Sequence, residues 1–220
     1  MNRFFKSSIG KKLSMAISAI FLMVFLLQHF LINITSVFSE SLFNMLSHFM
    51  GTNPLVQFLL QPILIAGVLF HFIMGFVLEF ENRKAASTGY AMVDGKKNST
   101  WMSRNMIWSG MVILAFLVLH FIDFWIPEMK YKYIEFLPDD PNRYYHELVH
   151  KFENPLRVGV YCFAFVLLAL HLLHGFSSSL KSLGANKLYA KSIKTFAYIY
   201  SIGIPLGFCV IAIYHYYNSL

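Results

Sequence analysis

Five long apolar stretches dominate the sequence, at about residues 13–35, 56–80, 105–127, 156–180 and 194–216. Each is long enough to cross a bilayer, which takes about 20 predominantly apolar residues in a helix. Only 13% of the residues are charged, about half the usual share of a soluble domain. A lone strand cannot satisfy its backbone in lipid, so each span must be helical. We therefore predict an all-α protein with one domain, residues 1–220, and five transmembrane helices.

The distribution of basic residues predicts how this bundle sits in the membrane. Lys and Arg cluster before the first span, between the second and third, and between the fourth and fifth. The segment at 36–55 has none, and the one after the third span mixes basic with acidic residues. By the positive-inside rule the N-terminus is cytoplasmic and the C-terminus lies outside. The net charge of +7 thus indicates orientation in a bacterial inner membrane rather than a nucleic-acid partner.

Four of the five spans place a histidine inside an apolar run, as in FLLQHFLIN, LFHFIMG, VLHFIDF and LALHLLHG. Helix rise puts His29 and His120 about 24 and 22 Å from the cytoplasmic ends of their helices. His71 and His171 each lie about 14 Å from the cytoplasmic end. If all four face inward, they form an outer pair, His29 with His120, and an inner pair, His71 with His171.

Two imidazoles at each level are the axial ligands that a haem b requires, and its apolar ring suits a bundle core. The predicted architecture is therefore a four-helix core that holds two haems, with the fifth helix peripheral. Neither cysteine, Cys162 or Cys209, belongs to a CxxCH motif, so attachment would be noncovalent. Zinc is less favoured because Cys and carboxylate partners are missing at both levels. His174 lies three residues after His171, and spacing alone does not choose between them.

Several short segments, taken together, point to one family. They are QHFLIN at 28–33, FNMLSHFMG at 43–51, LFHFIMG at 69–75, Arg104 through Ser109-Gly110 to His120, and HLLHGFSSSLKSLG at 171–184. In their order and spacing the chain resembles the cytochrome b membrane subunit of succinate:quinone oxidoreductases (succinate dehydrogenase and fumarate reductase), of the five-helix, two-haem type. That family has Gly four residues after its fourth ligand and again at the helix end. Gly175 and Gly184 match these offsets from His171, so the resemblance selects His171 over His174.

The resemblance implies a respiratory electron carrier that contains no catalytic residue for dicarboxylate chemistry. A flavoprotein and an iron–sulfur protein would dock at the cytoplasmic face and carry out that chemistry. Electrons would pass between the iron–sulfur subunit, the inner haem, the outer haem and a membrane quinone, which in two-haem members is usually menaquinone.

Other residues are candidates for supporting roles. Arg104, Lys181 and Ser14 lie on the cytoplasmic side of the inner level, where they would contact haem propionates or simply anchor the interface. His48 and Asp123 are candidates for a quinone or proton site near the outer haem. The alternatives are an exposed loop histidine for His48 and an interfacial hydrogen bond for Asp123.

The remaining expectations concern the outer boundary of the membrane. We expect His146, His150 and His215 to be surface residues. Tyrosines toward the ends of the fifth span would form an aromatic belt: Tyr198, Tyr200, Tyr214, Tyr216 and Tyr217.

Two rival functions fit the same sequence. The first is another two-haem cytochrome b, such as the membrane subunit of a hydrogenase or a formate dehydrogenase, which would bind different soluble partners. The second is a haem-free transporter or anchor whose histidines only pack or form hydrogen bonds between helices.

Overall fold

The computed structural model describes residues 7–86, 105–184 and 190–220. These residues form helices and connecting turns, without a strand. Within them, five helices are long and apolar enough to cross a membrane: Ser8–Phe38, Val56–Lys84, Met106–Tyr133, Pro155–Ser182 and Lys191–Asn218. The predicted all-α, five-span character is therefore confirmed, and each span is a few residues longer than its predicted core.

Two of the spans contain a π-helical turn. The first span is α2 (Ser8–Phe38), and the second is η1 (Val56–Leu60) followed by α4 (Gln61–Ala86). The third is α7 (Met106–His120), η2 (Phe121–Trp125) and α8 (Ile126–Tyr133). The fourth and fifth are α10 (Pro155–Ser182) and α11 (Ala190–Asn218). Asn154 caps α10, because its side chain accepts hydrogen bonds from the backbone N–H groups of Leu156 and Arg157.

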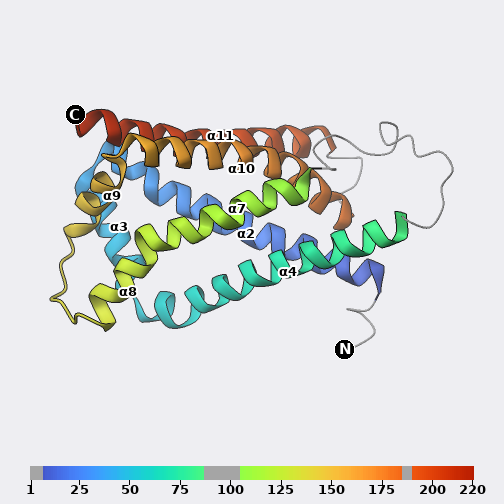
Figure 1. Cartoon of the computed structure of the whole chain (residues 1–220), viewed down its shortest axis with the longest axis horizontal. Coiled ribbons are helices and arrows are strands. Elements are labelled where there is room, and N and C mark those ends of the chain that lie inside the picture. The colour runs from blue at the N-terminus through green and yellow to red at the C-terminus, as the bar shows by residue number, and fades with distance from the viewer. Residues whose placement is uncertain (1–6, 87–104, 185–189) are drawn as a thin grey trace.

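Four helices form a ring around the centre of the molecule, and Figure 1 shows them lying lengthwise beside one another. Around this ring α2 packs against α4, α4 against α7, α7 against α10, and α10 against α2. Consequently α2 lies opposite α7, and α4 lies opposite α10. Side chains on opposite helices can thus meet across the centre of the bundle.

α11 lies outside the ring, along α10 and α2, yet it is not a loosely attached peripheral helix. The hydroxyl of Tyr200 donates to the Met23 carbonyl at 2.5 Å, and Tyr200 is buried. His215 is only 1% exposed, with its Nε2 2.8 Å from the Ser36 hydroxyl oxygen. The predictions that His215 is a surface residue and that Tyr200 belongs to an aromatic belt are wrong, because both side chains face α2. Tyr198 and Tyr217 are exposed.

One end of the ring, here called the capped end, is covered by α8, α3 (Glu40–Thr52) and α9 (Arg143–Phe152) (Figure 1). The segment predicted as a loop at 36–55 is thus largely helical. The helix α3 in this segment is capped by Ser39, whose hydroxyl accepts a hydrogen bond from the Leu42 N–H at 3.2 Å. The opposite end, called the basic end, is formed by the first turns of α2 and α7 and the last turns of α4 and α10 (Figure 1). The ends of α4 and α10 carry Arg83, Lys84 and Lys181 there.

Partly exposed ion pairs connect the helices of the capped end. The Glu128 carboxylate pairs with both Lys132 and Arg143, and Arg143 also binds Glu147 at 2.7 Å. Burial lowers the pKa of Arg143, but the hydrogen bonds to Glu128 and Glu147 outweigh it and raise this pKa above its ordinary value. Arg143 therefore stays charged and ties α9 to α8.

Candidate functional site

A cavity of about 810 Å³ runs through the ring from the basic end to the capped end. Lys12 and Lys181 line one end of it, and Asn33 and Trp125 line the other. Apolar side chains make up most of its wall, and its volume falls within the roughly 300–1,000 Å³ typical of ligand and cofactor pockets. All four histidines singled out in the sequence line this cavity: His29, His71, His120 and His171.

The pair nearer the capped end joins opposite helices α2 and α7. The ring centroids of His29 and His120 are 5.8 Å apart, and their planes are 88° apart. Phe25 stacks on His29 with a centroid distance of 5.5 Å, and Phe116 stacks on His120 at 5.9 Å. These phenylalanines lie one turn before each histidine and restrict the orientation of its ring.

The pair nearer the basic end joins the other two helices, α4 and α10. The ring centroids of His71 and His171 are 6.4 Å apart, with the planes at 68°. Nδ1 of His71 lies 3.1 Å from the Ser18 hydroxyl oxygen, and Nδ1 of His171 lies 3.2 Å from that of Ser109. Each imidazole of this pair is thus held by a serine from a neighbouring helix.

The ring separations fit one metal between two imidazoles. An imidazole nitrogen binds a transition metal at about 2 Å, as at zinc sites, so two rings sharing one metal have centroids about 6 Å apart. Both pairs, at 5.8 and 6.4 Å, match this spacing. Among the described residues no group of three or more His, Cys, Asp or Glu side chains is arranged to hold a metal ion. Two imidazoles per level are a haem ligand set and leave a tetrahedral zinc site incomplete.

The two levels are separated by the same helical distance on two helices. Ser18 marks the level of His71 on α2, and His29 follows eleven residues later. Ser109 marks the level of His171 on α7, and His120 also follows eleven residues later. At the helical rise, eleven residues correspond to about 16 Å between levels. The structure therefore places each pair at its own height, as the sequence predicted. The depths estimated from the sequence gave a separation of only about 8–10 Å, which is smaller than the separation in the structure.

The sequence interpretation overlooked a pattern that α2 and α7 share. Both helices carry Met, Ser, Phe and His at identical spacing: Met15, Ser18, Phe25, His29 and Met106, Ser109, Phe116, His120. In both helices the serine hydroxyl donates to the methionine carbonyl, at 2.8 and 2.9 Å. The repeated spacing is a signal in the sequence that would have identified Ser18 and Ser109 beforehand.

The opposite helices α4 and α10 share a second pattern, a glycine four residues after the histidine. A Cβ added at Gly75 would lie 3.8 Å from the Met15 methyl, and one at Gly175 would lie 3.4 Å from the Met106 methyl. The methionines of one helix pair therefore pack over the glycines of the other. The same contacts of methionine with glycine and of serine with histidine are thus repeated on both sides of the histidine pair nearer the basic end.

His171 and His174 occupy different places in the cavity. The ring of His171 faces His71 and reaches Ser109, whereas His174 lies one turn nearer the basic end. His174 lines the same cavity, with no hydrogen-bond partner among the described residues. The geometry therefore agrees with the choice of His171 for the pair and leaves His174 at the mouth.

The three residues proposed for propionate contacts fall in different surroundings. Lys181 lines the mouth of the cavity at the basic end. Ser14 is buried, but it is not among the residues that line the cavity, and Arg104 lies outside the described residues. Polar lining residues at this end of the cavity that the sequence interpretation did not propose for the site are Lys12, Glu79, Asn82, Ser178, Ser179 and Ser182.

Neither candidate for the quinone or proton site lines the cavity. Asp123 is 3% exposed, forms an ion pair with Arg157 and accepts a hydrogen bond from the Tyr161 hydroxyl at 2.7 Å. His48 lies on α3, with its Nε2 3.5 Å from an Asp139 carboxylate oxygen. Asp123 therefore binds α10 to η2 through an interfacial hydrogen bond and an ion pair. Tyr161 connects it to the cavity, because the Tyr161 side chain is part of the wall.

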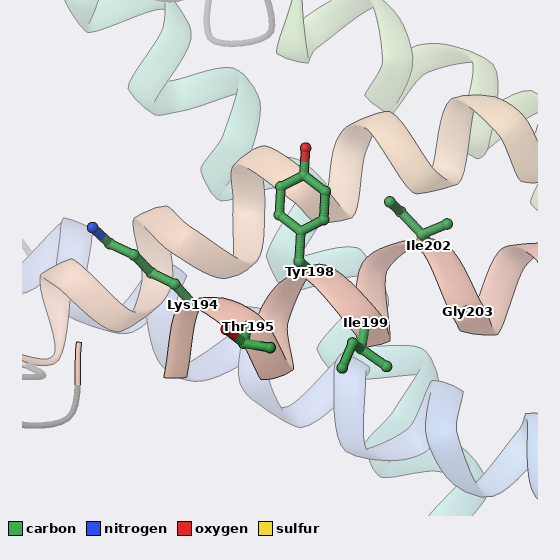
Figure 2. Close-up of a pocket in the computed structure, with 6 residues that line it drawn as sticks. All are labelled: Lys194, Thr195, Tyr198, Ile199, Ile202 and Gly203. Carbon is green, nitrogen blue, oxygen red and sulfur yellow. The ribbon is translucent and has the colours of Figure 1, made fainter. Parts of the chain in front are cut away.

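A second, shallower hollow lies on α11 and is lined by Lys194, Thr195, Tyr198, Ile199, Ile202 and Gly203 (Figure 2). Tyr198 and Ile199 are more than half exposed there. All of its lining comes from one helix, without a histidine or a carboxylate. It has the character of a lipid-facing surface rather than a site for chemistry.

Comparison of the chain with protein-family models, with curated proteins and with solved structures found no match. The functional conclusion therefore depends on the geometry of the cavity and on the motifs in the sequence.

Proposed function

We propose that this chain is the di-haem cytochrome b membrane subunit of a succinate:quinone oxidoreductase. The observation that carries the proposal is that two histidine pairs line one apolar cavity at two different heights. The ring centroids within the pairs are 5.8 and 6.4 Å apart. His71 and His171 would hold the inner haem b, and His29 and His120 the outer one. Bound haem supplies a centre that accepts and donates single electrons.

The protein's own contribution is to fix four imidazoles and exclude water from the cavity. Phe25 and Phe116 pack on the outer imidazoles, and Ser18 and Ser109 bind the inner ones. At the basic end Lys12 and Lys181 line the mouth, where cations suit the anionic propionates of a haem. Because the two histidine levels are about 16 Å apart, two haems bound there would span much of the hydrocarbon thickness of about 30 Å.

The basic end is the proposed cytoplasmic face, because the positive-inside rule puts clustered Lys and Arg there. A flavoprotein and an iron–sulfur protein would dock on this face, close to the inner haem. Membrane quinone, usually menaquinone in the family that the chain resembles, would exchange electrons with the haems. Asp123 stays tied to Arg157 and Tyr161 in this proposal and holds the capped end together.

The test is affinity purification of the full chain from its native membrane, with haem quantification and identification of co-purifying subunits. We expect two haem b per chain, a b-type alpha band in the reduced-minus-oxidised spectrum, and a flavoprotein with an iron–sulfur protein. Haem with hydrogenase or formate dehydrogenase subunits would assign the chain to another oxidoreductase. Absence of the alpha band would show that the chain is a haem-free anchor or transporter and that the proposed function is wrong.

A further inference from the structure

The two histidine pairs differ in the contacts that their Nδ1 atoms make. At the inner level both Nδ1 atoms meet a serine hydroxyl, at 3.1 and 3.2 Å. At the outer level the Nδ1 of His120 is buried without a partner among the described residues. Among the described residues His29 has only the Asn33 amide nitrogen, which lies 3.5 Å from both ring nitrogens and donates to the His29 carbonyl at 2.8 Å.

The serine hydroxyls at the inner level have their single proton engaged elsewhere. Ser18 donates to the Met15 carbonyl at 2.8 Å, and Ser109 donates to the Met106 carbonyl at 2.9 Å. A hydroxyl carries one donor and two acceptor lone pairs, so a serine whose proton lies on the methionine carbonyl accepts a hydrogen bond from its histidine. The proton of each imidazole is therefore on Nδ1, and Nε2 keeps a free lone pair.

From this arrangement we propose that Ser18 and Ser109 are positioning residues that lock His71 and His171 in the tautomer that ligates through Nε2. The inference rests on the proposed function, since it concerns the inner haem. A hydrogen bond from the distal N–H of a ligating imidazole raises the basicity of that ligand. More basic ligands stabilise ferric over ferrous iron, so the two serines lower the potential of the inner haem.

The shared pattern of α2 and α7 supports an equal role for the two serines. Each lies three residues after a methionine and eleven before an outer histidine, and each reaches an imidazole on a neighbouring helix. The two inner imidazoles therefore make the same kind of contact, one with Ser18 of α2 and the other with Ser109 of α7. Their ring planes, 68° apart, are set by these two anchors.

The experiment measures haem midpoint potentials and low-temperature EPR spectra of the purified full-length protein and its variants. Ser18→Ala and Ser109→Ala remove one hydrogen bond each, and Ser18→Thr and Ser109→Thr keep a hydroxyl. His71→Ala identifies the signal of the inner haem by its loss. Ser36→Ala is the matched control, because Ser36 donates to the Asn33 carbonyl at 2.7 Å and contacts His215, which does not line the cavity.

We expect each alanine variant to raise the potential of the inner haem and to change its EPR line, which reports the angle between the ligand planes. The threonine variants should restore both, and Ser36→Ala should change neither. If an alanine variant loses the inner haem, retention of that haem in the threonine variant still supports the inference.

Unchanged potential and EPR in both alanine variants, or threonine variants that behave like alanine, would overturn the inference while leaving the proposed function intact. An equal shift of both haems, or the same shift in Ser36→Ala, would overturn it as well. Wild-type protein that carries no haem would overturn the proposed function and this inference together.

Discussion

The ring of His71 on α4 lies 6.4 Å from the ring of His171 on α10, and each is bound at Nδ1 by a serine from another helix. His174 is one helical turn away on α10 and takes no part in this contact. His171 and His174 therefore differ in their contacts, although they lie on nearly the same face of α10. This difference leads directly to a haem-counting prediction.

Replacement of His71 or His171 by Ala should remove one of two haems, because an iron held at the inner level would lose an axial imidazole. His174→Ala should keep both haems, since its ring lies at the mouth of the cavity. The measurement is the ratio of haem to protein in purified variants. Loss of a haem in His174→Ala, with both retained in His171→Ala, would show that the wrong histidine was chosen.

The buried ion pair between Asp123 and Arg157 should stabilise the capped end. Arg157→Leu leaves the carboxylate of Asp123, 3% exposed, without its cation, and should lower the free energy of unfolding by about 3 kcal/mol. Asp123→Asn should cost less, because the Arg157 side chain is 33% exposed and reaches the interface. Thermal unfolding in detergent measures both variants.

The double variant Asp123→Asn with Arg157→Leu separates this explanation from simple packing loss. It should be more stable than Arg157→Leu alone, because no unpaired charge remains buried. Equal or lower stability of the double variant would mean that the ion pair is not the origin of the effect.

Gly207 should be needed for the close approach of α11 to α2. A Cβ at this position would collide with the ring of Phe30, so Gly207→Ala should destabilise the protein by about 1–3 kcal/mol. Gly203 on the same helix has no atom within 4 Å of its added Cβ. Gly203→Ala should therefore be neutral or stabilising by about 0.5–1 kcal/mol. Equal melting temperatures for both variants would contradict the observed packing.

His215 should contribute to stability and not to haem binding. It is 1% exposed and contacts the Ser36 hydroxyl at 2.8 Å, so His215→Ala should cost about 2 kcal/mol through a lost hydrogen bond and an unfilled space. The haem content should stay at two per chain. His150→Ala, at a 77% exposed side chain, is the matched control and should change neither quantity. Loss of haem in His215→Ala would give this residue a role that its position outside the cavity does not explain.

Some features of the site were determined by the sequence. The length of the apolar stretches required helices, because no other backbone conformation satisfies its hydrogen bonds in lipid. The constant helical rise then assigned His29 and His120 to one level and His71 and His171 to another, which is why the pairs could be predicted by counting residues. The separation of the two levels depends on where each helix enters the membrane, and counting residues underestimated it. The repeat of Met, Ser, Phe and His on α2 and α7 was also present in the sequence, although it was overlooked.

Other features were decided only by the tertiary structure. Hydropathy does not specify which face of α11 turns inward, so only packing against α2 showed that His215 and Tyr200 are buried. The contacts of Ser18 with His71 and of Ser109 with His171 depend on helix rotation and on which helices are neighbours. The rotation of each helix and the choice of its neighbours arise from side chains that interdigitate across the bundle. The order of residues along the chain indicates how deep a residue lies, but it does not indicate toward which neighbour its side chain points.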